Sequence, residues 1–167
     1  MLDELLFPEL GGFVIFDVAS IRETARNHST TNMLELFQDE LIGYEVVSKG
    51  ITVPISGLSP DDYAISIVYN AQHSQIVGNP VKKSDGWIIK STGLVGVCGL
   101  GYFHDFDLQA IMLKDKAILK EVPPGVHMLT LLAGYTMDSH PCIEFLIVPT
   151  YGVTAIFTAS LDTDFDF

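Results

Sequence analysis

The sequence predicts a mainly β protein of the α+β class, an antiparallel β-sandwich or barrel-like double sheet with a short N-terminal helical segment. Helical periodicity is confined to the first quarter of the chain, and short β-branched and aromatic runs follow from residue 45 onward. Clusters of Gly, Pro, Asp and Ser separate these runs. About ten short strands at such spacing are typical of two packed sheets.

Residues 20–42 are the predicted helical segment. Ser20 followed by Glu23 matches a capping box, which would start a helix there. The apolar residues that recur at helical spacing are Met33, Leu34, Phe37 and Leu41. The acidic residues on the opposite face are Glu35, Asp39 and Glu40.

Residues 45–159 are the predicted β-sheet core. Strands are expected at residues 45–47, 51–55, 63–69, 87–90, 94–98, 108–113, 117–122, 128–133, 143–148 and 153–159. The glycines at 93, 96, 99 and 101 are expected to let bulky neighbours approach the backbone closely.

Residues 160–167 form an acidic aromatic tail, in which phenylalanines alternate with Asp162, Asp164 and Asp166. The tail is expected either to fray at the surface or to serve as a binding segment. In the second case it would add as a strand or dock into a basic groove, with its phenylalanines inward and its aspartates outward. Deletion of residues 161–167 would then weaken partner binding but leave melting unchanged.

The composition describes one globular domain over residues 1–167, with 48% hydrophobic residues and 18% charged residues. A chain of this length buries about two-thirds of its unfolded surface, so it is expected to fold without a disulfide. The longest apolar run, residues 93–103, is about half as long as a membrane-spanning helix, so no membrane contact is predicted. Asp3 and Glu4 stand where a secretory signal would carry Lys or Arg, which favours the cytoplasm.

The charge of the chain is unevenly placed. Residues 1–80 carry eleven Asp or Glu and three Lys or Arg, and residues 121–167 carry six acids and no Lys or Arg. The formal net charge is −12. Nucleic acid is excluded as a ligand because clustered Lys and Arg bind phosphate backbones. A basic protein is the complementary partner.

The candidate contacts for this partner are acids on the helix face and in turns, joined by two aromatic residues. They are Glu35, Asp39, Glu40, Asp61, Asp62, Tyr102, Phe103, Asp105 and Asp107. Aromatic anchors surrounded by charged residues are typical of interface hot spots. Strand alternation would also place Asp105 and Asp107 on one solvated edge. That single pair is too few oxygens for calcium.

No motif for catalysis or for a cofactor is present. The chain lacks a Gly-x-Ser-x-Gly elbow, a phosphate loop and a dinucleotide fingerprint. Its five histidines show no metal-ligand spacing, and His140 with Cys142 lacks a second pair of zinc ligands. Cys98 and Cys142 are predicted to be buried thiols within strands. We therefore predict a non-enzymatic protein without a cofactor.

The chain is short and acidic, and its helical segment comes early. A turn, Val122-Pro123-Pro124-Gly125, precedes a long apolar strand. In these features the chain resembles small bacterial nuclease inhibitors. These include toxin-immunity proteins, among them those of contact-dependent growth inhibition systems, and the inhibitor of the competence DNA-entry nuclease. The pattern covers roughly residues 45–135. The resemblance implies an immunity protein that covers the active site or substrate groove of a nuclease toxin.

Two other classes of function stay open. One is a small-ligand or carbohydrate-binding β-sandwich, with Trp87, Tyr102 and Tyr151 as stacking surfaces. The other is a structural subunit of a bacterial or phage assembly, in which the acidic surface supplies solubility.

Overall fold

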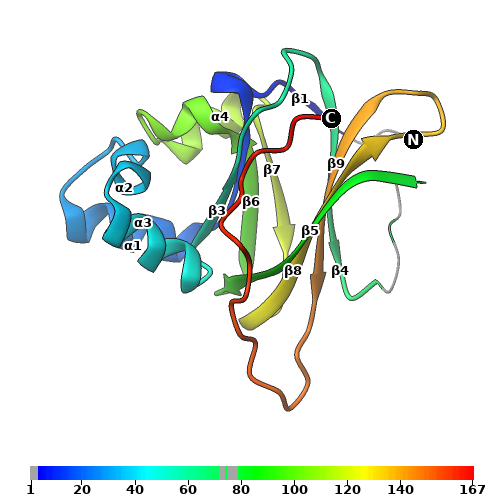
Figure 1. Ribbon diagram of the computed structural model, residues 1–167. Helices are drawn as coiled ribbons and strands as arrows, with labels where there is room; N and C mark the ends of the chain where they lie inside the picture. The colour runs from blue at the N-terminus through cyan, green and yellow to red at the C-terminus, as the bar shows by residue number, and fades with distance from the viewer. Residues whose placement is uncertain (1–3, 72–73, 75–78) are drawn as a thin grey trace.

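Two β-sheets pack face to face, and helices cover the outer face of one of them (Figure 1). The computed structural model describes residues 4–71, 74 and 79–167. One sheet has five strands in the order β1-β4-β9-β8-β5, and the other has four in the order β3-β2-β6-β7. All pairs are antiparallel except β4 with β9, which is parallel. The predicted mainly β, double-sheet fold is confirmed.

The elements have the following bounds. The five-stranded sheet contains β1 (Leu5–Leu6), β4 (Tyr63–Tyr69), β5 (Asn79–Ser91), β8 (Gly125–Tyr135) and β9 (Pro141–Val148). The four-stranded sheet contains β2 (Phe13–Asp17), β3 (Thr52–Ile55), β6 (Leu94–Gly99) and β7 (Ala117–Glu121). The helices are α1 (Val18–His28), α2 (Leu34–Gln38), α3 (Glu40–Ser48) and α4 (Leu108–Leu113), with 3-10 turns η1 (Glu9–Gly11) and η2 (Leu100–Phe103).

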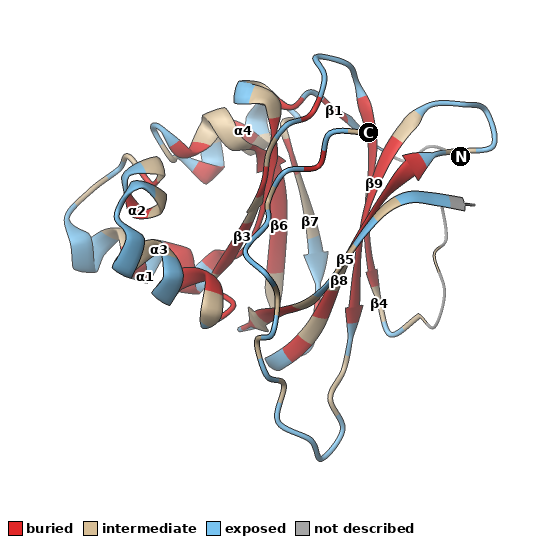
Figure 2. Ribbon diagram, viewed as in Figure 1, coloured by how far each residue is buried: buried red, intermediate tan, exposed pale blue. Residues whose placement is uncertain are grey.

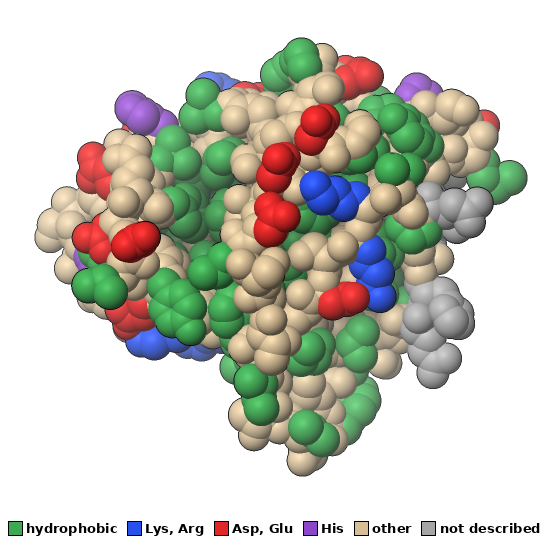
Figure 3. Space-filling view, viewed as in Figure 1, with side chains coloured by type: hydrophobic (Ala, Val, Ile, Leu, Met, Phe, Trp, Pro, Cys, Tyr) green, Lys and Arg blue, Asp and Glu red, His purple; other side chains and the backbone are tan. Residues whose placement is uncertain are grey.

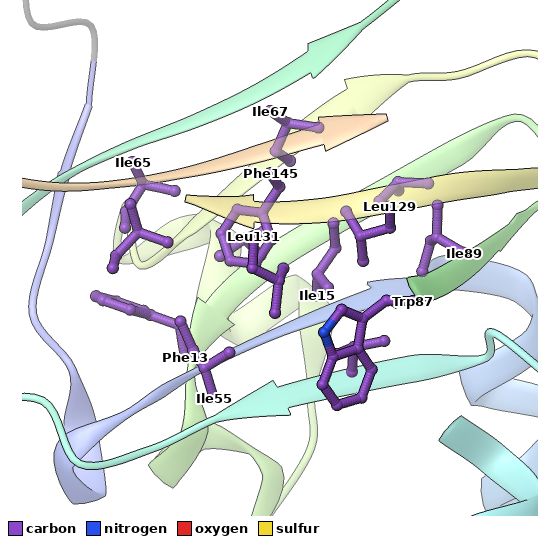
Figure 4. Close-up of a cluster of buried hydrophobic side chains, with 14 of the residues drawn as sticks. Phe13, Ile15, Ile55, Ile65, Ile67, Trp87, Ile89, Leu129, Leu131 and Phe145 are labelled. Carbon is purple, nitrogen blue, oxygen red and sulfur yellow. The ribbon is translucent and has the colours of Figure 1, made fainter. Parts of the chain in front are cut away.

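The core lies in two layers. Between the sheets, Trp87 packs among side chains such as Ile15, Leu129 and Phe145, as Figure 4 shows. Between the four-stranded sheet and the helices lies a second cluster that includes Phe16 and Phe103. Figure 2 shows both layers as buried positions along the strands and the inner helix faces.

Strand β2 was not among the predicted strands because it is buried on both of its faces. Phe13 and Ile15 belong to the core between the sheets, whereas Val14 and Phe16 belong to the core beneath the helices. A doubly buried strand reads as a continuous apolar run and shows no alternation.

The helical region extends further than predicted and is broken into three helices. Asp17, and not Ser20, caps α1, because the Asp17 carboxylate accepts a hydrogen bond from the Ser20 amide at 2.8 Å. Asp39 caps α3 in the same way, and α3 takes up residues 45–47, which were predicted as a strand. The break at Asp39 turns Leu41 outward, and this side chain is 84% exposed.

Two further predicted strands are absent from the structure. Residues 108–113 form α4, in which Leu108 and Ile111 are buried at helical spacing. Asp107 caps this helix by accepting a hydrogen bond from the Ala110 amide at 3.1 Å. Residues 153–159 have no regular structure.

The glycine-rich run allows close contacts, as predicted. A side chain at Gly96 would meet the Phe16 ring at 2.8 Å and Leu119 at 2.9 Å. A side chain at Gly101 would meet Glu9 at 2.8 Å, and one at Gly99 would collide with the Glu9 carboxylate. Gly93 differs, since its Cβ position is open and its φ of 129° is the reason for glycine there.

Candidate protein interaction surface

The C-terminal residues 157–167, called the strap, close one open side of the sandwich (Figure 1). The Phe165 side chain is fully buried in the core between the sheets. At one end Phe157 contacts Trp87, with ring centroids 5.9 Å apart. At the other end Phe167 contacts Tyr63 at 6.2 Å and Tyr135 at 5.7 Å. The tail is therefore part of the fold and is not frayed.

Backbone hydrogen bonds join the strap to both sheets. The Ser56 amide donates to the Thr163 carbonyl at 2.8 Å, and the Phe165 amide donates to the Ser56 carbonyl at 2.7 Å. The amides of Thr158 and Ala159 donate to the Gly86 carbonyl at 2.8 and 3.0 Å. Because β3 and β5 are edge strands of the two sheets, the strap covers edges that would otherwise be free to pair with another chain.

The strap carries a row of outward carboxylates that we call the acidic ladder: Asp162, Asp164 and Asp166. The amide of Asp164 donates to the Asp162 carboxylate at 3.1 Å, and the amide of Asp166 donates to the Asp164 carboxylate at 3.1 Å. Figure 3 shows acidic side chains in a row along this segment, beside a few basic ones. The aspartates point outward, as predicted for a binding segment, but Phe165 packs into the protein's own core and not into the groove of a partner.

The predicted contacts Asp61 and Asp62 are exposed in the loop that precedes β4. Burial raises the pKa of the neighbouring Tyr63, and the charges of Asp61 and Asp166 raise it further. The Tyr63 phenol therefore lies within electrostatic reach of one carboxylate of the loop and one of the strap.

The predicted contacts Glu35, Asp39 and Glu40 are exposed at the corner between α2 and α3. Glu35 accepts a hydrogen bond from the Asn32 amide group at 3.2 Å. Asp39 accepts from the amides of Leu41 and Ile42 at 3.0 and 2.9 Å, so its carboxylate stabilises α3. The Glu40 carboxylate makes no hydrogen bond or ion pair within the residues that the structure describes.

Exposed apolar side chains lie next to these acids. On α3, Leu41 is 84% exposed and Tyr44 is 55% exposed. The Tyr44 ring contacts Phe157 at the start of the strap, with centroids 6.2 Å apart. Ile156, which precedes Phe157, is 65% exposed. These residues connect the helix corner to the strap through an apolar surface.

We call this surface the α3 patch: Asp39, Glu40, Leu41, Tyr44 and Ile156. Sequence reasoning missed Leu41, Tyr44 and Ile156 as surface residues. Leu41 was assigned to the core on the assumption of one unbroken helix, although Asp39 is a residue that commonly caps helices.

The remaining predicted contacts lie around η2 and α4. Phe103 is fully buried and stacks with Phe37 at 6.2 Å, so its ring cannot serve as an exposed anchor. Tyr102 is half-buried, and burial together with a hydrogen bond to Glu9 raises the pKa of Tyr102 to about 12. The Asp107 carboxylate is engaged in capping α4, because it accepts a hydrogen bond from the Ala110 amide.

Asp105 and Asp107 also face basic residues. They line an open groove of about 480 Å³ together with Arg22 and Arg26 of α1. This region therefore carries both signs of charge. The acidic ladder also has a cation beside it, because Lys82 donates a hydrogen bond to the Asp164 carbonyl. Asp39 and Glu40 of the α3 patch form no ion pair among the described residues.

The sugar-stacking alternative loses its central residue. Trp87 is fully buried between the sheets, and its indole N–H donates to the Ser84 hydroxyl at 2.8 Å. Tyr151 is exposed on the loop before the strap, whereas the half-buried Tyr102 is hydrogen-bonded to Glu9. The three aromatics thus form no common stacking face.

The two cysteines are buried free thiols, as predicted. Burial raises the pKa of the Cys98 thiol strongly and that of Cys142 to about 11, where the neighbouring Glu144 charge adds to the shift. Both are therefore poor nucleophiles near neutral pH.

The described residues contain neither a metal-binding cluster nor a membrane-spanning helix. Among the described residues, no group of three or more His, Cys, Asp and Glu side chains could hold a metal ion. His73, one of the five histidines, lies outside these residues. Within the same part of the chain, no helix is both long and apolar enough to cross a membrane.

Comparisons with known proteins define the fold alone. No protein family model matches the chain. No curated protein matches it either. A solved structure titled "Crocagin biosynthetic gene J" is similar, with a TM-score of 0.52 and 12% sequence identity. The similarity covers 87% of this chain and 94% of that one.

Proposed function

We propose that this protein is a non-enzymatic binding protein whose α3 patch and acidic ladder dock onto a basic protein. The observation that supports it best is the pair of exposed apolar side chains Leu41 and Tyr44 beside Asp39 and Glu40. Exposed apolar residues within a polar rim mark protein interaction sites. The net charge of −12 adds attraction for a basic partner and speeds association.

The architecture around these residues supports a preformed surface. Asp39 is fixed by its cap bonds, Tyr44 by its ring contact with Phe157, and the acidic ladder by the burial of Phe165. Side chains that are already ordered lose less entropy on binding, which favours tight complexes.

The most specific form of this proposal is an immunity protein that covers the basic groove of a nuclease toxin. A carboxylate-rich surface can occupy a groove that binds phosphates, and apolar anchors would supply the slow dissociation. The resemblance of the sequence to nuclease inhibitors suggests this form.

The test is affinity capture from the native lysate with the wild-type protein and two variants. Leu41→Ser with Tyr44→Ser removes the apolar anchors, and Leu113→Ser, an 80% exposed leucine on α4, is the matched control. We expect the wild type and the control to retain one basic protein that elutes as salt is raised, and the double variant to lose it.

Two results would contradict the proposal. Equal capture by the double variant would remove the α3 patch as the contact surface. Recovery of the chain alone, with a mass that rises with concentration, would favour a structural subunit instead. Nuclease activity in the captured partner, blocked by the purified chain, would support the immunity form.

A further inference from the structure

A narrow polar cleft of about 180 Å³ lies between α1 and α3. The two helices lie next to each other in Figure 1, on the outer face of the four-stranded sheet. Its lining includes Ser20 and Thr24 of α1, both buried, and Lys90 of β5. At about 30 Å³ per water in the liquid, the cleft has room for about six waters or a molecule of similar size.

The Ser20 hydroxyl is the first sign that the cleft takes a ligand. Ser20 is 4% exposed, and its Oγ has no hydrogen-bond partner in the part of the chain that the structure describes. The neighbouring Thr24 hydroxyl is already occupied, since it donates to the Ser20 carbonyl at 2.9 Å. A buried hydroxyl without a partner is unfavourable, so its presence in this cleft points to a group that binds it.

The charges around the cleft are of both signs. Lys49 and Glu45 form an ion pair on α3, and they largely neutralise each other. Lys90, half-buried, and Glu23, exposed on α1, make no ion pair among the described residues. Besides His28, which also lines the cleft, Lys90 is thus an available cation and Glu23 an available carboxylate.

The size and charge of the cleft select the class of ligand. A small anion would be opposed by the net charge of −12, and a small cation would be drawn to many other carboxylates. A neutral molecule that carries one negative and one positive group avoids both effects and matches Lys90 and Glu23. Its negative group would also supply the acceptor that the Ser20 hydroxyl lacks.

We propose that the cleft between α1 and α3 binds a small zwitterion of the free α-amino acid class. Lys90 and the Ser20 hydroxyl hold the carboxylate, and Glu23 holds the ammonium group. This site is separate from the α3 patch, so it stands or falls independently of the proposed binding function.

The test is calorimetric titration of the full chain with glycine, L-alanine and L-serine. Acetate and methylammonium, which each carry one of the two charges, are titrated in parallel. We expect saturable binding of at least one amino acid, and binding at least about tenfold weaker for each singly charged compound.

Three variants assign the contacts. Lys90→Met keeps the aliphatic stem of the side chain, and Glu23→Gln keeps its size, and each is expected to raise the Kd by about tenfold. Ser20→Ala should raise the Kd without lowering the melting temperature, because its hydroxyl has no partner and alanine favours helices. Lys120→Met, an exposed lysine on β7, is the matched control and should leave the Kd unchanged.

The absence of saturable binding for all three amino acids would overturn the proposal. Acetate binding as tight as that of the amino acids would overturn the assignment to a zwitterion. An unchanged Kd in Lys90→Met would show that the ligand lies elsewhere.

Discussion

The Nζ atom of Lys82 lies 5.4 Å from the centre of the Phe165 ring, and the same ammonium group donates a hydrogen bond to the Asp164 carbonyl. Lys82 belongs to β5, whereas Phe165 is inserted into the core from the strap. The contact therefore fixes the strap at the edge of the five-stranded sheet, with cation–π attraction and a hydrogen bond acting together.

The Phe165 side chain of the strap should contribute strongly to the stability of the fold. We expect Phe165→Ala to lower the free energy of unfolding by about 3–5 kcal/mol, because a fully buried ring is removed. The measurement is urea denaturation, with Asp166→Ala as the control, since this exposed side chain should change stability by less than about 0.5 kcal/mol. Equal stability of Phe165→Ala and the control would mean that the strap is not packed as described.

This expectation corrects the one drawn from the sequence, in which deletion of residues 161–167 leaves melting unchanged. Because the deletion removes Phe165 and Phe167 from their contacts in the core, we expect it to lower the melting temperature. Loss of partner binding alone would restore the original interpretation.

Gly86 of β5, which contacts the strap, should tolerate a side chain poorly. Its φ is 85°, and an added Cβ would meet the Thr158 hydroxyl at 2.6 Å and the Ala159 amide at 2.8 Å. Gly152 has a similar φ of 68° but open space around it, so Gly152→Ala reports backbone strain alone, about 1 kcal/mol. We expect Gly86→Ala to cost clearly more in chemical denaturation, and equal losses would rule out the clash.

Asp17 should contribute more to stability than the helix-capping carboxylate of Asp107. It is fully buried and accepts hydrogen bonds from the Ser20 amide at 2.8 Å, the Thr92 amide at 2.7 Å and the Thr92 hydroxyl at 2.9 Å. Asp17→Ala leaves these donors unsatisfied, so we expect a loss of about 3 kcal/mol. Asp107→Ala removes an exposed helix cap and should lower the free energy of unfolding by about 1 kcal/mol. Both variants are measured by thermal unfolding. A smaller effect at Asp17 than at Asp107 would contradict this ranking.

Stability should fall at alkaline pH through Cys142. Burial, with the Glu144 charge adding to it, raises the pKa of this thiol from 9.0 to about 11, so the folded state retains a proton that the unfolded state loses first. The contribution is complete below pH 9 and is lost as the pH rises toward 11. As the pH rises across this range, the melting temperature should fall less steeply in Cys142→Ala than in the wild type. Parallel curves of melting temperature against pH would contradict a role for the Cys142 thiol.

Several features followed from the sequence because they depend on local pattern. The predicted run at 63–69 forms β4, and the predicted runs at 94–98 and 143–148 lie within β6 and β9. The run at residues 108–113 is equally apolar but forms α4, since the Asp107 cap and the burial of Leu108 and Ile111 favour the helix. Short apolar runs do not distinguish strand from helix by composition.

The candidate site was predictable in its charge but not in its anchors. Glu35, Asp39 and Glu40 are exposed as their polarity required, whereas Phe103 is buried and Leu41 is exposed, against expectation. Whether an apolar side chain faces solvent depends on where the helix breaks and on what packs against it. These are properties of the assembled chain.

The sequence by itself determined the mainly β class, the acidic character and the alternation of phenylalanine and aspartate in the last residues. Only the tertiary structure decided that the phenylalanines of this segment close the protein's own sandwich and that Tyr44 meets Phe157. The physical reason is range: periodicity and charge are local properties of the chain, whereas burial requires partners that are far apart in the sequence, such as Ser56 and Phe165, which are separated by 109 residues.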